Sequence, residues 1–229
     1  VLKDEKSRLY YDLLSLVYEE KDFPDVATMS PFLNSANKLD LNIRALNIYS
    51  VTGQIIKTKA QKIHKIMTFS EAKSNLFKTA LKNWLFGWWS LSAINKNIKA
   101  ISANLNIAEN SKRENLKLFI HNMIALNEER KPGFACMLAN LAKNYTASEK
   151  EKTLLDKFIA LTGIYPEKKL PEWNYKQLQS VQLFVPAIFA FFLLIAMCSA
   201  FFSPAIFAPK QREINYNQTV RGMAGNNTF

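Results

Sequence analysis

Hydrophobic residues recur at helical spacing through much of the chain. Leu9, Leu13, Leu16 and Val17 share one face of a 3.6-residue repeat, which predicts a helix over Leu2–Lys21. Beyond residue 113, similar stripes predict three consecutive helices, with a break at Pro132-Gly133 and a stop at Gly163. The stripes are Leu116, Phe119, Ile120, Met123 and Ile124, then Phe134, Met137, Leu138 and Leu141, then a segment that Ser148 and Glu151 begin as a capping box.

Between residues 45 and 66 the pattern changes to two runs rich in β-branched residues on either side of Thr52-Gly53. Two such runs around a glycine turn predict a small β-hairpin. The second run, Gln54–Met67, could equally begin a basic helix, because it carries a lysine every few residues. The pattern leaves both structures open.

One apolar run near the C-terminal end has no charged residue from Val181 to Phe202. As a helix it would cover roughly 33 Å, close to the bilayer core of about 30 Å. A core helix of a soluble protein is the alternative, but such a helix is rarely apolar on every face. Trp173 and Tyr175 precede the run, where aromatic rings favour the bilayer interface. We therefore predict one membrane span.

The heptad F-x-P-A-I-F-A occurs twice in this region, at Phe184–Ala190 and at Phe202–Ala208. An offset of five helical turns would place the two copies roughly 27 Å apart, about one bilayer thickness. We expect the first proline to be a first-turn residue or a shallow kink and the second to end the helix. The residues that mark the span are Phe184, Pro186, Phe189, Phe202 and Pro204.

These patterns predict a mainly α protein with a helical N-terminal domain, a small β-hairpin and one C-terminal transmembrane helix. The domain would occupy residues 1–175 and would be soluble or lie on the membrane surface. Residues 176–209 would form the transmembrane segment and residues 210–229 a short polar tail.

The net charge of +11 predicts an anionic partner, such as a membrane face, an acidic protein or nucleic acid. The segment from residue 54 to residue 100 contains nine lysines and one acid, Glu71, and forms the main basic patch. The candidates for contact with a membrane surface or partner are Lys57, Lys59, Lys62, Lys65, Lys78 and Lys82.

A tryptophan-rich segment, Asn83–Ile94, interrupts the lysines and is too short for an ordinary span. Its tryptophans, Trp84, Trp88 and Trp89, would pack in the domain core or lie at a bilayer surface among lipid headgroups. Stacking on nucleic acid is the least favoured alternative, because the aromatic residues cluster on one apolar run and the chain has few arginines.

The stretch Gly87-Trp88-Trp89-Ser90-Leu91 resembles a loosely defined set of uncharacterised bacterial proteins. In those proteins a G-W-W-[GS]-[ILF] motif closes an apolar segment beside a membrane. The resemblance covers about a quarter of the chain and implies membrane proximity without an activity. This sequence departs from the pattern after the motif, where Ser92-Ala93 replaces the usual Pro and Gly, so a re-entrant turn is not implied.

Residues for catalysis or metal binding do not form a recognisable pattern in the sequence. His64 and His121 have no Asp, Glu or Cys at ligand spacing, and we expect His121 at a helix surface or half-buried. A nucleophile elbow and a glycine-rich phosphate loop are both missing from the sequence. Cys136 and Cys198 are expected to be buried thiols. We predict a non-enzymatic protein without cofactor or metal.

The sequence therefore favours an accessory or structural subunit of a larger membrane assembly, with the lipid bilayer and other subunits as partners. The alternative is a membrane-tethered adaptor that binds a soluble partner through its helical hairpins. The charged N-terminal stretch has no apolar secretory signal, which favours a bacterial inner membrane with a cytoplasmic N-terminal domain. The numbers of positive charges on the two sides of the span are equal, so they do not set its orientation in the membrane.

Overall fold

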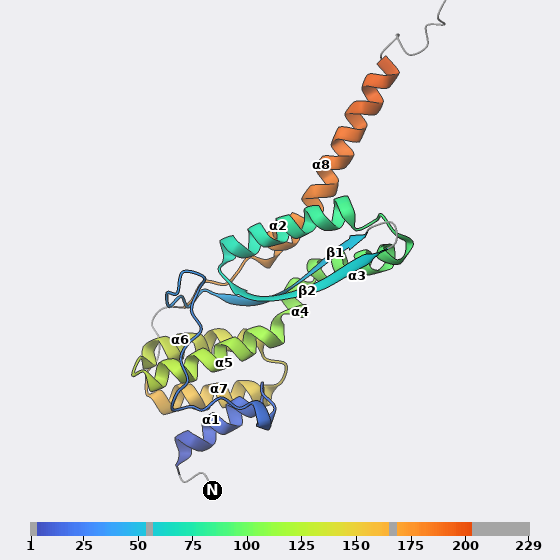
Figure 1. Cartoon of the computed structure of the whole chain (residues 1–229). Coiled ribbons are helices and arrows are strands. Elements are labelled where there is room, and N and C mark those ends of the chain that lie inside the picture. The colour runs from blue at the N-terminus through green and yellow to red at the C-terminus, as the bar shows by residue number, and fades with distance from the viewer. Residues whose placement is uncertain (1–3, 54–56, 165–168, 203–229) are drawn as a thin grey trace, which may run out of the picture. The chain divides into compact units, whose positions relative to one another are not determined.

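A computed structural model describes residues 4–53, 57–164 and 169–202 of the chain. Contacts between Cα atoms divide the chain into a compact unit, Val1–Ala187, and a second unit, Ile188–Phe229. The described residues form eight α-helices and one two-stranded antiparallel sheet (Figure 1), which confirms the predicted mainly α fold. The elements are α1 (Glu5–Ser15), β1 (Arg44–Gly53), β2 (Thr58–Met67), α2 (Phe69–Phe86), α3 (Leu91–Leu105), α4 (Ile107–Asn110), α5 (Lys112–Glu128), α6 (Pro132–Ala142), α7 (Glu149–Thr162) and α8 (Tyr175–Phe202), with short 3₁₀ helices at Glu20–Asp22 and Lys143–Tyr145.

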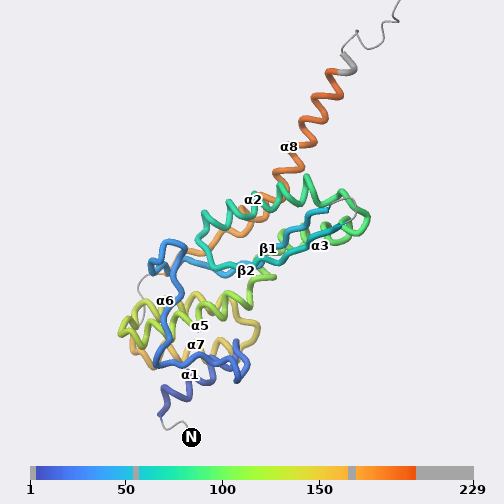
Figure 2. The backbone as a smooth tube through the Cα atoms, in the orientation of Figure 1, coloured from blue at the N-terminus to red at the C-terminus, as the bar shows by residue number. Residues whose placement is uncertain are grey.

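Helices α1, α5, α6 and α7 pack together as a bundle (Figure 2). Helix α5 is its centre, since every side chain from Leu118 to Leu126 is buried. The predicted break is confirmed: α5 ends at Glu128, and α6 begins at Pro132, whose missing N–H costs nothing in a first turn. Helix α7 ends at Gly163 as predicted, with that glycine left-handed at φ 64°.

Two local predictions in the bundle need correction. Helix α1 stops at Ser15, well before Lys21, and a 3₁₀ turn follows it. The capping box of α7 is only half formed: the Ser148 side chain accepts from Glu151 N–H, but the Glu151 carboxylate accepts from Ala147 N–H. That carboxylate also binds Arg113 of α5 at 2.8 Å, so it ties two helices together as well as capping one.

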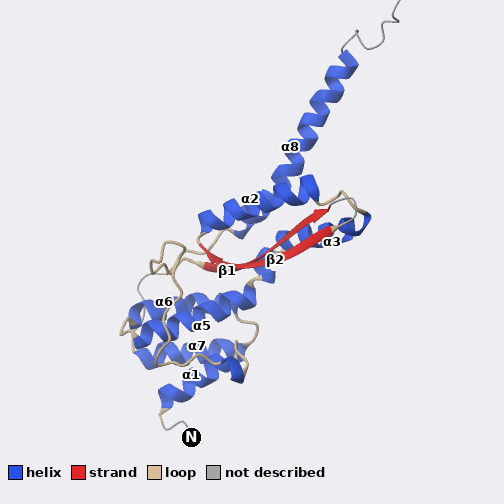
Figure 3. Cartoon of the chain, in the orientation of Figure 1, coloured by secondary structure: helices blue, strands red, loops and turns tan. Residues whose placement is uncertain are grey.

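Strands β1 and β2 form the predicted hairpin (Figure 3), with a register that runs from Arg44 opposite Met67 to Gly53 opposite Thr58. The helix alternative for the second run is therefore wrong. Strand β1 is covered on both faces: Leu46 and Ile48 pack in a cluster with residues of α2 and α8, whereas Val51 packs with residues of α3. Strand β2 is exposed over most of its length.

Side-chain amides bind the edge of β1 that faces away from β2. Asn115 accepts from the backbone N–H of Ala45 and donates to its carbonyl, both at 2.9 Å. Asn104 makes the same pair of bonds to Tyr49, both at 2.8 Å. Between and beyond them, Asn47 N–H donates to Ser111 Oγ, and Val51 N–H donates to Asn83 Oδ1 at 2.8 Å. Since a carboxamide presents the same donor and acceptor as a peptide group, these side chains take the place of a third strand.

Arg44 is fully buried at the start of β1. Its guanidinium carbon lies 4.9 Å from the ring centre of Phe119 and 5.5 Å from that of Trp173, and Nη1 donates to the Ile43 carbonyl at 2.8 Å. Trp173, predicted to lie at the bilayer interface, is instead buried and donates its N–H to the Asn42 carbonyl. The Trp173 ring packs on the buried guanidinium of Arg44. This contact explains why a tryptophan, a residue common at bilayer interfaces, lies inside the domain.

The two cysteines differ in their surroundings. Cys136 is buried in the bundle as predicted, with Thr162 Oγ1 at 2.8 Å from its sulfur. Cys198 is exposed on α8, contrary to the prediction, because every described side chain from Ala187 to Ser199 is exposed.

His121 is buried in the bundle, more deeply than the sequence predicted. Its Nδ1 lies 3.0 Å from the Tyr18 hydroxyl and its Nε2 lies 3.0 Å from the Ser30 carbonyl. Because a carbonyl only accepts, the proton belongs on Nε2, and Nδ1 accepts from Tyr18. Burial lowers the pKa of His121 from its ordinary value of 6.5, with a smaller contribution from the positive charge of Lys117, against the opposing effect of the Ser30 hydrogen bond.

We expect acidification to destabilise the bundle through this imidazole. The unfolded chain takes up the proton more readily than the folded chain, so the contribution is complete above the unfolded pKa of about 6.5 and is lost as the pH falls below it. The carboxylates with lowered pKa, Glu71, Glu128 and Glu151, titrate at more acidic pH. Denaturant unfolding of the full chain at pH 7.5 and 5.5 measures the effect. His121→Gln should reduce the difference in stability between the two pH values. If the variant loses as much stability at pH 5.5 as the unmodified chain does, groups other than His121 cause the effect.

Candidate membrane-facing surface

Helix α8 is the described helix that is long and apolar enough to cross a membrane, with a candidate span at Tyr175–Ser199 whose most apolar 18-residue window has a mean hydropathy of 2.5. Its first turns pack in the domain, where Leu178, Val181, Gln182 and Val185 are buried at helical spacing. No described residue of α8 after Val185 is buried. The side chains thus change within one turn from a packed face to an exposed apolar surface.

Pro186 lies inside α8, eleven positions after its first residue, so the predicted first-turn position is wrong. A proline inside a helix has no N–H for the carbonyl four residues earlier, which here belongs to Gln182. The indole N–H of Trp84 on α2 donates to this carbonyl at 3.0 Å. Trp84 therefore satisfies the acceptor that Pro186 leaves open, and it fixes α2 to α8 at that level.

The end of α2, the turn after it and the start of α3 expose large apolar side chains just beyond Trp84. We call the four of them the apolar tip: Leu85, Phe86, Trp89 and Leu91. Trp89 is 67% exposed and Leu91 is 89% exposed, and two such large apolar side chains two residues apart are unusual on an aqueous surface. The three tryptophans therefore differ in their surroundings. Trp84 and Trp88 are half-buried in the domain, with ring centres 5.6 Å apart, whereas Trp89 is exposed.

Close packing holds the apolar tip in place. A Cβ atom on Gly87 would lie 2.3 Å from the side chain of Asn97 and 2.4 Å from the Asn83 carbonyl, so only glycine fits there. Asn97 Nδ2 donates to that same carbonyl at 2.9 Å, which joins α3 to the end of α2. Ser90 then caps α3 by accepting from Ala93 N–H. The stretch that resembles the bacterial motif is therefore a tight helix-to-helix connection.

The predicted lysines are all exposed, and they do not share one face. Lys59 and Lys65 lie opposite Thr52 and Leu46 and so belong to the α2 side of the hairpin, whereas Lys62 lies opposite Tyr49 on the α3 side. Lys62 joins Lys96 and Lys99 of α3 around a hollow of about 400 Å³. Lys57 directly precedes β2. Lys78 and Lys82 occupy successive turns of α2, four residues apart.

The other predicted markers of the span lie on or beyond α8. Phe184 and Phe189 are exposed, and Phe202 is the last residue of the helix. Pro204 lies outside the described residues. The amide contacts to β1 were not predicted; their signal was asparagine, a poor helix former, recurring along the segments that form α2, α3 and α5.

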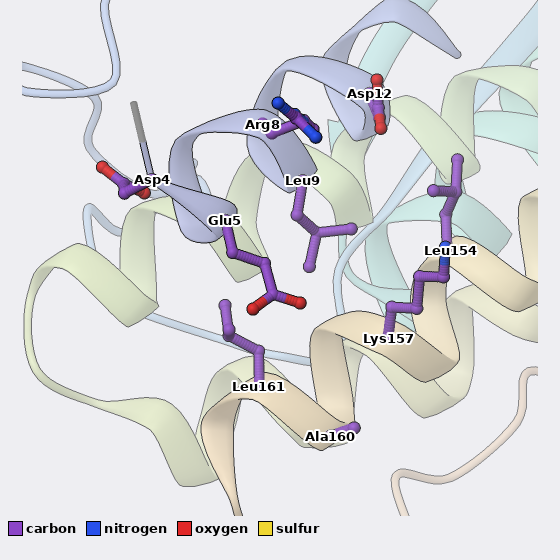
Figure 4. Close-up of a pocket in the computed structure, with 9 residues that line it drawn as sticks. All are labelled: Asp4, Glu5, Arg8, Leu9, Asp12, Leu154, Lys157, Ala160 and Leu161. Carbon is purple, nitrogen blue, oxygen red and sulfur yellow. The ribbon is translucent and has the colours of Figure 1, made fainter. Parts of the chain in front are cut away.

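A second concave surface, of about 780 Å³, lies between α1 and α7. Figure 4 shows Glu5 and Leu9 reaching from α1 toward α7, where Leu161 and Lys157 line the opposite side. One of its carboxylates, Asp4, caps α1, and hydrogen bonds from the backbone and hydroxyl of Ser7 lower its pKa. Among the described residues, His, Cys, Asp and Glu form no group that could hold a metal ion.

No protein-family model, curated protein or solved structure matches this chain. The bacterial motif resemblance therefore stays a prediction. The described residues form a helical protein with one candidate membrane helix, and they expose the apolar tip and a concave surface between α1 and α7.

Proposed function

We propose that this protein is a non-enzymatic, membrane-anchored accessory or structural subunit of a larger membrane assembly. Helix α8 spans the bilayer, most simply a bacterial inner membrane, and the N-terminal domain lies on its cytoplasmic face. The observation that carries the proposal is the bond from Trp84 to the Gln182 carbonyl, because it holds the apolar tip at the level where α8 becomes exposed and apolar. The apolar tip then inserts among lipid headgroups, as amphipathic aromatic segments do.

Strand β2 supplies the surface for another subunit. Backbone pairing alternates along an antiparallel strand, so the N–H and C=O groups of Ala60, Lys62 and His64 point away from β1. An exposed edge of this kind can accept a strand from a partner, and lysine side chains along it favour an acidic one. The opposite edge of the sheet is already bound by asparagine and serine side chains.

Spin labels on the full chain in nanodiscs containing anionic lipid test the contact between the apolar tip and the membrane. Leu91→Cys should give a label protected from a water-soluble relaxation agent and accessible to oxygen, in a background with Cys136→Ser and Cys198→Ser. Phe134→Cys on α6, also exposed, serves as the matched position in the bundle. If the labels at positions 91 and 134 are equally accessible to the water-soluble relaxation agent, the apolar tip is not inserted in the membrane.

The size of the protein extracted gently from its native membrane tests the assembly. We expect a complex larger than one chain in its micelle, and Lys59→Glu/Lys62→Glu/Lys65→Glu should release the chain from it. The matched control is Lys131→Glu/Lys150→Glu/Lys152→Glu in the bundle, outside both β2 and the lining of the concave surface between α1 and α7. A lone monomer in the unmodified protein would contradict the subunit function.

The adaptor function is a second candidate, favoured by the concave surface between α1 and α7. Its apolar floor includes Leu9, Leu154 and Leu161, and both carboxylates and bases surround it. A soluble peptide with an apolar anchor and mixed charge fits this chemistry. A monomer in detergent that loses a soluble partner upon Leu161→Glu, and keeps it upon Lys59→Glu, would favour the adaptor over the subunit.

A further inference from the structure

A groove of about 790 Å³ runs between the first half of α2 and the first turns of α8, within the compact unit. We propose that it binds one anionic phospholipid, with the phosphate at Lys73 and one acyl chain along Phe77 and Phe184. This inference rests on the proposed membrane anchoring by α8.

The groove changes from polar to apolar along its length. The lining residues of α2 and α8 advance together: Ser70 and Gln177 begin the groove, and Phe77 and Phe184 follow seven residues later on each helix. The two helices therefore run in the same direction along the groove. Seven residues of helix correspond to about 10 Å.

This length fits the layer through which a lipid passes from headgroup to acyl chain. The headgroup region adds roughly 5–8 Å on each side of the hydrocarbon core. If Phe184 lies at the boundary of that core, Ser180 and Lys73, four residues or about 6 Å before Phe184 and Phe77, lie among the headgroups, and Gln177 and Ser70 lie at their outer edge. Helix α8 from Phe184 to Phe202 covers about 27 Å, close to the core thickness. The polar end of the groove is thus at headgroup depth.

Charge selects the kind of lipid. Lys73 lines the groove, is exposed, and has no salt bridge among the described residues. The hydroxyls of Ser70 and Ser74 lie on the same wall and can donate to phosphate oxygens. An ammonium with neighbouring hydroxyl donors favours a phosphodiester that carries a net negative charge over one whose charge a choline neutralises. Phe77 and Leu183 are exposed and provide an apolar surface on which an acyl chain can pack.

Native mass spectrometry of the full chain from mixed micelles tests the inference, with phosphatidylglycerol and phosphatidylcholine supplied in equal amounts. We expect one retained phosphatidylglycerol per chain. Lys73→Gln should reduce the preference for the anionic lipid about fivefold, the effect of roughly one nearby lysine charge. Lys150→Gln, exposed on α7 and outside the groove lining, should leave it unchanged.

Groove occupancy is tested separately with Ser180→Trp, which fills the groove from α8 and should abolish lipid retention in a protein whose unfolding midpoint is unchanged. Equal retention of both lipids, or no effect of Lys73→Gln, would overturn the anionic site. A protein that resists carbonate extraction but retains no lipid, or that crosslinks to another polypeptide through the groove, would overturn the inference and leave the anchor intact. Release by carbonate would overturn the proposed function itself.

Discussion

Asn115→Leu is expected to lower the free energy of unfolding of the domain by about 3 kcal/mol or more, because leaving each buried polar group without a partner costs about 1–3 kcal/mol. The change keeps the side-chain size but removes both bonds to Ala45, one to its N–H and one to its carbonyl. Both backbone groups lie on the covered strand β1, where water cannot replace the lost partners without opening the helix packing. Urea unfolding of the full chain in micelles, followed by circular dichroism, gives the value.

Asn95→Leu is the matched control, since Asn95 lies on an exposed face of α3, and its effect should stay within about 0.5 kcal/mol. Amide hydrogen exchange provides a second measurement. The Ala45 N–H should lose its protection in Asn115→Leu, and the Tyr49 N–H, held by Asn104, should keep it. Equal stability of the two leucine variants would mean that the amides do not act as the missing strand partner.

The sequence was sufficient for the helices whose apolar residues repeat on one face. Pro132 and Gly163 mark real helix ends, because a first-turn proline and a left-handed glycine act through local backbone geometry alone. The sequence did not decide between a hairpin and a helix over the second run. Strand β2 lies at an edge and is exposed, so its side chains carry little hydrophobic pattern. Its pairing with β1 settles the choice.

Longer-range contacts could not be predicted in the same way. Trp173 has the residue type and position of an interfacial aromatic, but its surroundings include Arg44 and Phe69, which are distant in sequence. The lysines between residues 54 and 100 were predicted to form one patch because they are numerous in the sequence, not because their positions in space were known. Strand alternation distributes Lys62 and Lys65 to opposite faces once β2 is known to be a strand.

The asparagines of α3 carry a sequence signal for the contacts with β1. Asn97 and Asn104 are one heptad apart inside α3 and are fully buried. Asparagine disfavours helix interiors because its side chain competes for backbone hydrogen bonds. Here that competition is directed outward, to the backbone of β1 and to the end of α2. Repeated asparagines on the buried face of a helix can therefore indicate a nearby strand edge.

Trp84→Phe is expected to destabilise the docking of α2 on α8 by about 1–3 kcal/mol, because it leaves the Gln182 carbonyl without the indole N–H and Pro186 cannot supply another. The cost should shrink when Pro186→Ala is present, since an alanine N–H at that position can bond the same carbonyl within the helix. A double-mutant cycle on the full chain in micelles, measured by urea unfolding, isolates this coupling. Trp88→Phe is the matched control, because its ring packs on Trp84 at an angle of 47° without bonding Gln182, and its cost should not depend on Pro186. If Trp84→Phe costs the same with proline or alanine at position 186, the indole stabilises the contact by packing alone, and the depth of the apolar tip is no longer tied to the proline of α8.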